Sequence, residues 1–264
     1  MKKISVAVSG AYGRMGQEVC RAVLDEENME LVGVFDLQGQ GENIGKIIGE
    51  TKLDIVITGL TKEALQEIKP MVLVDFTTPM AVMDNIKTAL QSGVRPVVGT
   101  TGITSVDLSR ITEWVEKSGL SAIVAPNFAL GAVLMMKFAA EAARYFPQVE
   151  IIELHHDKKI DAPSGTALKT AEIITSERLK KPAEKDELLK LPGARGATQE
   201  GVHIHSVRLS GLVAHQEVIF GGLGQTLTIR HDSLDRSSFM PGVMLAIKNI
   251  VNLKGLVYGL ENMI

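Results

Sequence analysis

Cysteine, aromatic residues and surplus positive charge are all scarce in this chain of 264 residues. Cys20 is the only cysteine, which excludes an intramolecular disulfide and any zinc site built on cysteine pairs. Lys and Arg number 28 against 31 Asp and Glu, so the formal net charge is −3. Nucleic-acid-binding proteins need many Lys and Arg side chains to displace the counterions of the phosphate backbone, so this charge balance argues against a nucleic-acid partner. It still permits a small anionic ligand, which needs only a local patch of cations.

Long hydrophobic runs are missing as well. No stretch approaches the ~20 apolar residues of a membrane-spanning helix. The apolar segment near the start is broken by Ser9, Gly10 and Gly13 before it could form the core of a signal peptide. We therefore expect a cytoplasmic protein that does not bind membranes. Because 45% of the residues are hydrophobic, the chain can bury a large core, and this excludes intrinsic disorder of the whole.

The first half of the chain alternates short apolar runs with segments of helical hydrophobic spacing. Strands that are apolar throughout and joined by helices are typical of a parallel sheet covered on both faces. We therefore expect a doubly wound α/β domain. The predicted strands are 4–8, 31–35, 53–58, 71–75, 96–99 and 120–125, and the predicted helices are 15–24, 81–91 and 106–117.

The pattern changes after residue 127, which favours a second domain. Glycines separate the later apolar runs, and this suits antiparallel or mixed strand pairing. A polar stretch at 180–197 predicts a solvated loop, and the tail at 242–260 again has helical spacing. In this half we expect helices at 133–145 and 165–179, and strands at 150–155, 203–209, 216–220 and 226–230.

Three glycines, Gly10, Gly13 and Gly16, stand where the first predicted strand turns into the first helix. Glycines there permit a tight turn and let backbone N–H groups approach a pyrophosphate at the positive end of the helix. Asp36 ends the second strand, where a carboxylate would accept hydrogen bonds from ribose hydroxyls. The combination predicts dinucleotide binding. The alternative is an ordinary glycine turn, with Asp36 capping a loop.

A second glycine-containing turn, residues 99–102, directly follows a predicted strand. It lies at the carboxyl end of the sheet, where cofactors bind in such folds. By its pattern alone, a plain strand-to-helix turn explains it equally well.

The segment from Leu154 to Ala167 combines two His and two Lys within five residues with a Pro-Ser-Gly-Thr turn into a helix. Ser164 or Asp161 can cap that helix, so that N–H groups of its first turn point at an anion such as a carboxylate. The His and Lys side chains could also donate a proton. The pattern favours a small acidic substrate, and the alternative is a solvated charge run with one capped helix.

His203 and His205 occupy alternate positions of a predicted strand and could chelate a metal if both rings share a face. No cysteine or nearby carboxylate completes a ligand set. We therefore expect hydrogen-bonded histidines and no metal. Three arginines, Arg195, Arg208 and Arg236, could bind carboxylates, and the sequence does not rank them.

Over essentially its whole length the chain resembles the 4-hydroxy-tetrahydrodipicolinate reductase family, also called dihydrodipicolinate reductases, of the diaminopimelate route to lysine. The most specific likeness is the string His-His-x-x-Lys-x-Asp-Ala-Pro-Ser-Gly-Thr at 155–166. Supporting motifs occur in the family's order at 10–16, 74–77, 99–102, 125–128 and 205–209.

The resemblance implies a Rossmann-type domain formed by 1–126 and completed by 237–264, and an α+β substrate domain at 127–236. The mixed open sheet of the second domain would join four chains into a homotetramer. The implied reaction transfers a hydride from NADH or NADPH to a cyclic dicarboxylate, 4-hydroxy-tetrahydrodipicolinate, and gives tetrahydrodipicolinate.

The same resemblance implies roles for individual residues. His155 and Lys159 take the catalytic positions. The substrate positions are His156, Gly165 and Thr166. The cofactor positions are Gly10, Ala11, Tyr12, Gly13, Arg14, Met15, Asp36, Phe76, Gly99, Thr100, Thr101, Ala125, Pro126, Asn127 and Phe128.

Departures from the family pattern concern the nucleotide and the sheet. Asp36 is followed by Leu37, where members that hold the extra phosphate of NADPH have Arg, and this favours NADH. Arg14 could still reach the phosphate, so use of both nucleotides stays open. In the sheet region, Ala214 stands where the family has Gly, and Gln225 stands where it has an acidic residue. These two differences affect the expected tetramer contacts and not the expected chemistry.

Two other functions remain as alternatives. One is another two-domain NAD(P)-dependent dehydrogenase of aspartate-family metabolism, in which the Ala-Pro-Ser-Gly-Thr string is not expected. The other is a non-catalytic sensor of nicotinamide nucleotides, which would have no need for His155 and Lys159 beside an anion site.

Overall fold

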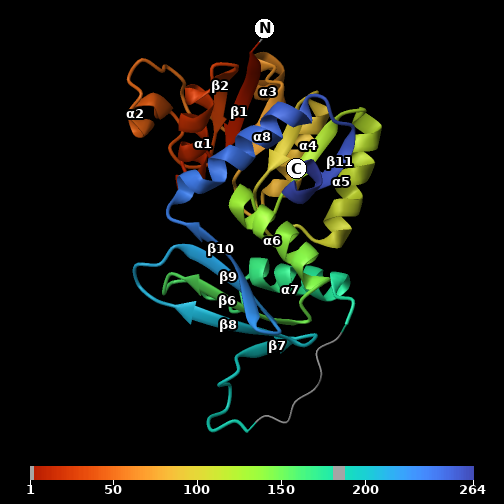
Figure 1. The fold of residues 1–264 in the computed structure, drawn as a ribbon. Coiled ribbons are helices and arrows are strands. Elements are labelled where there is room, and N and C mark those ends of the chain that lie inside the picture. The colour runs from red at the N-terminus through yellow and green to blue at the C-terminus, as the bar shows by residue number, and fades with distance from the viewer. Residues whose placement is uncertain (1–2, 181–187) are drawn as a thin grey trace. The chain divides into compact units, whose positions relative to one another are not determined.

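The computed structural model describes residues 3–180 and 188–264, and the chain divides into two compact units (Figure 1). The first comprises Met1–Phe128 and Phe239–Ile264, and the second comprises Ala129–Ser238. Each boundary lies two residues after the one that the resemblance implies. Of the loop predicted at 180–197, residues 181–187 lie outside the described ranges. Across those ranges, no helix combines the length and the apolar character needed to cross a membrane.

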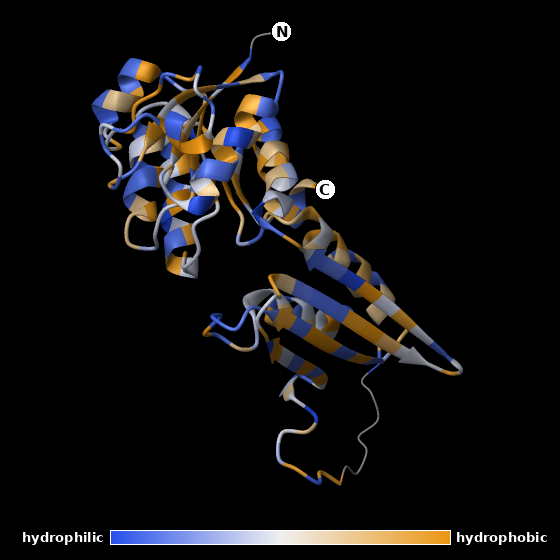
Figure 2. Cartoon of the chain, turned by 90° about the vertical axis from the view of Figure 1, so that its left-hand side faces the viewer, coloured by the Kyte–Doolittle hydropathy of each residue, from blue (hydrophilic) through white to orange (hydrophobic). Residues whose placement is uncertain are grey.

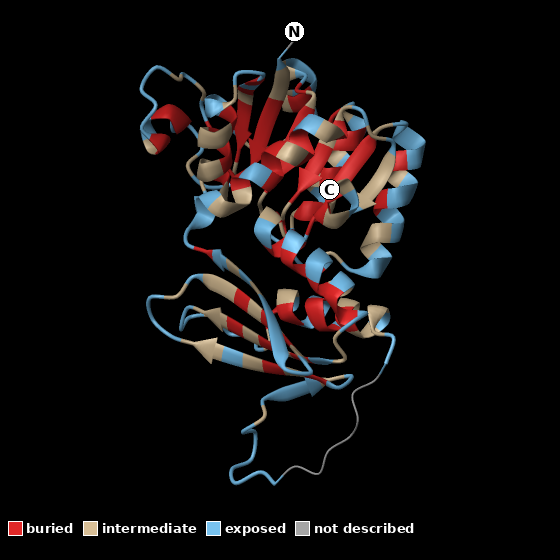
Figure 3. Ribbon diagram, in the orientation of Figure 1, coloured by how far each residue is buried: buried red, intermediate tan, exposed pale blue. Residues whose placement is uncertain are grey.

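The described part of the first unit is built on a six-stranded parallel sheet with the order β11-β5-β4-β3-β1-β2. The strands nearest its centre are buried, and they are red in Figure 3. The order reverses between β1 and β3, the point at which ligands bind in open parallel sheets. The strands are β1 (Ile4–Ser9), β2 (Met29–Phe35), β3 (Val72–Asp75), β4 (Arg95–Val98), β5 (Ser121–Val124) and β11 (Gly255–Tyr258).

Helices cover both faces of this sheet, which confirms the doubly wound α/β fold. Two of them, α1 and α8, pack together, and α8 contacts β4 and β5. On the other face α4 packs against α3 and α5, and apolar side chains of α4 and α5 form a buried cluster with Val98 and Val124. The helices are α1 (Arg14–Asp25), α2 (Ile44–Ile48), α3 (Lys62–Ile68), α4 (Val82–Gln91), α5 (Ser105–Ser118) and α8 (Met240–Ile250).

Two segments of the first unit differ from the sequence-based predictions. The strand predicted at 53–58 is wrong, because the segment makes only isolated bridges at Val56 and Thr58 and its backbone bonds largely to the neighbouring loop. The tail is not helical to residue 260. Helix α8 ends at Ile250, and from Gly255 (φ +78°) onward the chain forms β11 beside β5. The pairing of β11 with β5 determines the conformation of this segment, although its apolar residues have the spacing of a helix.

The second unit contains a mixed sheet with the order β10-β9-β6-β8-β7, as expected. Among the described strands of this second sheet, only β6 and β8 pair in parallel, and the other neighbours are antiparallel. Two helices, α6 (Leu130–Ala143) and α7 (Gly165–Glu177), lie along one face of this sheet (Figure 1). The strands are β6 (Gln148–His155), β7 (Ala197–Gln199), β8 (Val202–Arg208), β9 (Ala214–Gly222) and β10 (Gln225–Ser233).

Hydrophobic and hydrophilic residues alternate along the strands of the second sheet (Figure 2). One set, including Ile151, Val218 and Phe220, is buried, and on this face the Gln216 side chain donates a hydrogen bond to Thr170 of α7. The alternate set, including Ile152 and Ile219, is only half-buried. The face turned away from α6 and α7 is therefore the less covered one.

Candidate active site

The first glycine-rich turn, between β1 and α1, has backbone geometry that a side chain would disrupt. Gly10 has φ +81°, and a Cβ atom on it would collide with the Phe76 carbonyl at the end of β3. A Cβ atom on Gly16 would collide with the Gly10 carbonyl. Gly13 is the N-cap of α1, so the N–H groups of the first helical turn are oriented toward the carboxyl edge of the sheet. This cradle fits a pyrophosphate.

Asp36 lies over this turn. Its carboxylate accepts a hydrogen bond from the Tyr12 backbone N–H at 3.0 Å and another from Gln38 N–H at 2.9 Å. These bonds hold the carboxylate beside the glycine-rich turn, where it can accept from ribose hydroxyls. The next side chain, Leu37, is 86% exposed and brings no cation to the site. The predicted pairing of the turn with Asp36 is therefore present in the structure.

The other predicted cofactor residues of the first unit come together at the carboxyl ends of β3, β4 and β5. The Phe76 ring packs over Gly99, leaving no room for a Cβ atom there. The rings of Phe76 and Phe128 lie 5.8 Å apart. Thr100 is buried, and its side chain points back to β3. Three chain segments far apart in sequence thus form one edge of the candidate nucleotide site.

Asp75, the last residue of β3, organises this edge, and the sequence-based site prediction missed it. It is 1% exposed. Its carboxylate accepts hydrogen bonds from Thr100 Oγ1 at 2.6 Å, Thr77 Oγ1 at 2.8 Å and Asn85 Nδ2 at 2.8 Å. The available signal was an acidic residue that closes an otherwise apolar strand.

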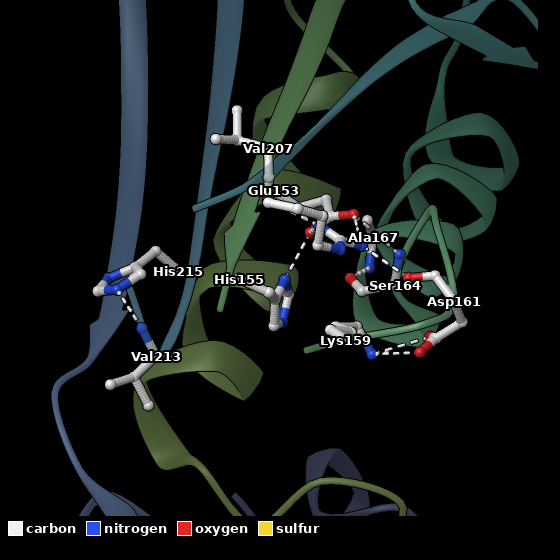
Figure 4. Close-up of polar contacts among 10 residues, drawn as sticks. Glu153, His155, Lys159, Asp161, Ser164, Ala167, Val207, Val213 and His215 are labelled. Carbon is white, nitrogen blue, oxygen red and sulfur yellow. Dashed lines mark hydrogen bonds and ion pairs between the residues drawn. The ribbon is translucent and has the colours of Figure 1, made fainter. Parts of the chain in front are cut away.

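In the second unit, the predicted substrate motif connects β6 to α7 (Figure 4). Ser164 caps α7, since its Oγ accepts a hydrogen bond from Ala167 N–H at 3.2 Å. Asp161, the other predicted cap, instead accepts from Lys159 Nζ at 2.7 and 2.8 Å. The first-turn N–H groups of Gly165 and Thr166 lack intrahelical partners by position, and a Cβ atom on Gly165 would meet open space. The helix start can therefore receive an anion.

Glu153 lies at the centre of this junction, although the sequence-based site prediction did not include it. Its side chain is fully buried and accepts two hydrogen bonds from Arg208, both at 2.8 Å. It also accepts from Ser164 N–H at 3.2 Å and lies 2.5 Å from His155 Nδ1. Burial alone would raise the pKa of Glu153, but the bonds from Arg208, Ser206 and His155 outweigh it and lower the pKa. The carboxylate is therefore ionised.

His155 is the last residue of β6 and lies close to Lys159. Burial lowers the pKa of His155, Glu153 opposes this effect, and the charges of Lys159 and Arg208 lower the pKa further. An ionised carboxylate only accepts hydrogen bonds, so Nδ1 carries the proton in the neutral ring. Nε2 then presents a lone pair. His156, the neighbouring predicted substrate residue, is exposed.

The two strand histidines are hydrogen-bonded. His205 Nε2 lies 2.7 Å from the carboxylate of Glu150 on the adjacent β6, and His203 Nδ1 lies 2.9 Å from the Arg195 carbonyl. Strand pairing brings the Glu150 carboxylate to His205, a hydrogen-bond partner that the sequence pattern did not indicate. Residues 3–180 and 188–264 contain no cluster of three or more His, Cys, Asp or Glu arranged to hold a metal ion.

Comparison with known proteins covers both units. The family model "Dihydrodipicolinate reductase, N-terminus" matches residues 4–128, and "Dihydrodipicolinate reductase, C-terminus" matches residues 131–264. The 4-hydroxy-tetrahydrodipicolinate reductase of Desulfitobacterium hafniense (strain DSM 10664 / DCB-2) is 56% identical over 99% of each chain. The enzyme of that name from Listeria monocytogenes serotype 4b (strain CLIP80459) is 56% identical over 98% of this chain and 99% of its own.

A solved structure agrees with these matches. The dipicolinate-bound dihydrodipicolinate reductase from Paenisporosarcina sp. TG-14 has a TM-score of 0.87 and 50% identity, covering 99% of this chain and 100% of its own. The resemblance of the chain to this family is thereby confirmed at the level of sequence and fold. The chain belongs to the dihydrodipicolinate reductase family, whose members are also named 4-hydroxy-tetrahydrodipicolinate reductases.

Proposed function

We propose that this chain reduces 4-hydroxy-tetrahydrodipicolinate with a nicotinamide nucleotide and gives tetrahydrodipicolinate. The hydroxyl group leaves together with one hydrogen of the ring as water, and a hydride and one proton are added to the ring. The observation that supports this best is the junction of β6 and α7. There, a capped helix start, Lys159 and two histidines lie within one short segment.

The first unit would hold the nucleotide, which supplies the hydride. The turn at Gly10 and the first turn of α1 suit its pyrophosphate, and Asp36 suits the hydroxyls of its adenosine ribose. Phe76, residues 99–101 and residues 125–128 would form the nicotinamide side of the site.

The second unit would hold the substrate, whose two carboxylates need two positively polarised groups. The N–H groups of Gly165 and Thr166 would receive one carboxylate, and the side chains of His156 and Lys159 would attract the other. Hydride addition leaves negative charge on the substrate ring, and a proton must be donated to neutralise it. Because the pKa of His155 is lowered, we assign the donation to Lys159, with His155 Nε2 beside it as acceptor and relay.

The activity is tested by adding NADH or NADPH to the freshly generated product of the preceding synthase and following loss of the reduced-nicotinamide absorbance. We expect turnover with both and a higher kcat/KM for NADH, by a few-fold. The Asp36 carboxylate repels the additional phosphate of NADPH, and Leu37 offers it no cation. A strong preference for NADPH would contradict this assignment. Absence of turnover with both would favour a nucleotide sensor.

We further propose that four chains associate through the less covered face of the second sheet. That face carries Ile152 and Ile219 together with the ion pair of Arg230 with Glu217. Light scattering should give a mass near four times the 28.5 kDa of one chain. The substitution Ile219→Arg should reduce that mass, because it buries an unpaired charge in the contact. A monomeric parent protein would contradict the proposal.

A further inference from the structure

Glu153, which is fully buried, and Arg208, whose side chain is 19% exposed, form an ion pair at the junction of β6 and α7. We propose that this pair is a positioning device: Glu153 fixes the ring of His155, and Arg208 ties the loop before α7 to the sheet. The inference rests on the proposed function only for the ligand that the site receives. Neither side chain would itself take part in the chemistry.

The first step of the argument is the orientation of the histidine. The Glu153 carboxylate lies 2.5 Å from His155 Nδ1, so it holds the Nδ1 proton and directs Nε2 away from the sheet. A histidine without such a partner would exchange between two tautomers, and only one of them has the lone pair on Nε2. Partners of this kind determine ring orientation at metal and catalytic sites.

The second step is the charge balance. A fully buried carboxylate next to a helix start would repel an anionic ligand and would be costly to bury alone. Arg208 approaches it with two parallel N–H groups, both at 2.8 Å, and cancels the charge. The pair therefore keeps the hydrogen-bonding capacity of Glu153 without its repulsion of a carboxylate substrate.

The third step is the loop. Arg208 also donates a hydrogen bond to the Asp161 carbonyl at 2.7 Å, and Glu153 accepts one from Ser164 N–H at 3.2 Å. Both ends of the turn before α7 are thus attached to one ion pair on the sheet. Because His155 is attached to the same carboxylate, its distance from the N–H groups of α7 is set by these bonds.

The charged groups that face His155 are Glu153 on β6, Lys159 on the loop and Arg208 on β8. Glu153 raises the pKa of His155, whereas Lys159 and Arg208 lower it. Removing the charge of Glu153 should therefore lower that pKa further. A merely structural role for Glu153 would not produce this change.

The test is the substitution Glu153→Gln, followed by a ¹⁵N NMR titration of the histidines in the nucleotide-free protein and by steady-state kinetics. We expect a lower pKa for His155, loss of its single tautomer and a fall in kcat of roughly 10- to 100-fold. The acid limb of the kcat profile should move to lower pH. Glu177→Gln is the matched control. Glu177 is the last residue of α7, far from the junction with β6, and its substitution breaks a different ion pair of this unit, the one with Arg144.

An unchanged pKa and tautomer of His155 in the Glu153→Gln variant would overturn the proposal. If the parent protein lacked reductase activity but the titration shifted, the positioning pair would stand and the proposed function would fail. If the Glu153→Gln variant did not fold, the Arg208→Lys variant would test the positioning role instead. Lysine keeps the positive charge of Arg208 but lacks its two parallel N–H groups. A raised KM for the substrate with an unchanged KM for the nucleotide would support the proposal, and an unchanged KM for both would overturn it.

Discussion

The substitution Lys159→Ala is expected to lower kcat by ~10²–10⁴-fold, the contribution of a positioned proton donor. Lys159 is held by both oxygens of Asp161, and its side chain is 21% exposed, so it is oriented and partly screened from water. The Kd for NADH should remain nearly unchanged, since the proposed nucleotide residues lie in the first unit. Stopped-flow reduction assays and a fluorescence titration with NADH measure the two quantities.

Lys158→Ala is the matched control for this prediction. Lys158 is the adjacent lysine, it is exposed, and it should tolerate the substitution with little change in kcat. A Lys159→Ala variant whose kcat stays within a few-fold of the parent value would remove Lys159 from the mechanism. A large loss in both variants would indicate a general effect of positive charge on the segment.

The substitution Gly10→Ala should weaken NADH and NADPH binding by roughly 10- to 100-fold, as expected for a strain of about 1–3 kcal/mol. The new methyl group would collide with the Phe76 carbonyl, and φ +81° is unfavourable for alanine. The turn must then move, and with it the N–H groups of α1. Isothermal titration calorimetry with each nucleotide measures the loss.

Gly93→Ala separates the collision from the backbone strain. Gly93 also has a positive φ, +79°, but a Cβ atom there meets nothing within 4 Å. This control should lose some thermal stability and keep nucleotide affinity. Parent-like affinity in a folded Gly10→Ala variant would show that the turn between β1 and α1 does not hold the nucleotide.

Local patterns were sufficient to predict most of the first unit. Its strands are apolar because both faces are covered, so short apolar runs coincide with β1 to β5. The incorrect predictions concern segments whose conformation depends on whether a neighbouring strand is available for pairing. Residues 53–58 have strand-like composition but meet only isolated bridge partners, and β11 forms because the free edge of β5 is available to it.

The same distinction applies to the candidate site. The glycine-rich turn, Asp36 and the start of α7 are local or follow from strand order, so sequence spacing predicts them. Glu153 and Arg208 lie on separate strands, and only the parallel pairing of β6 with β8 brings them together. Arg208 was one of three arginines that the sequence could not rank, and its ligand is a carboxylate of its own chain.

Strand β11 has a consequence for the order in which the protein assembles during translation. Residues 255–258 leave the ribosome only after the whole of the second unit has been made, and until then the outer edge of β5 has no neighbour. An unpaired apolar edge of this kind is a site for association between nascent chains. The interval between the synthesis of β5 and that of β11 is therefore the period in which the first unit is most prone to such association.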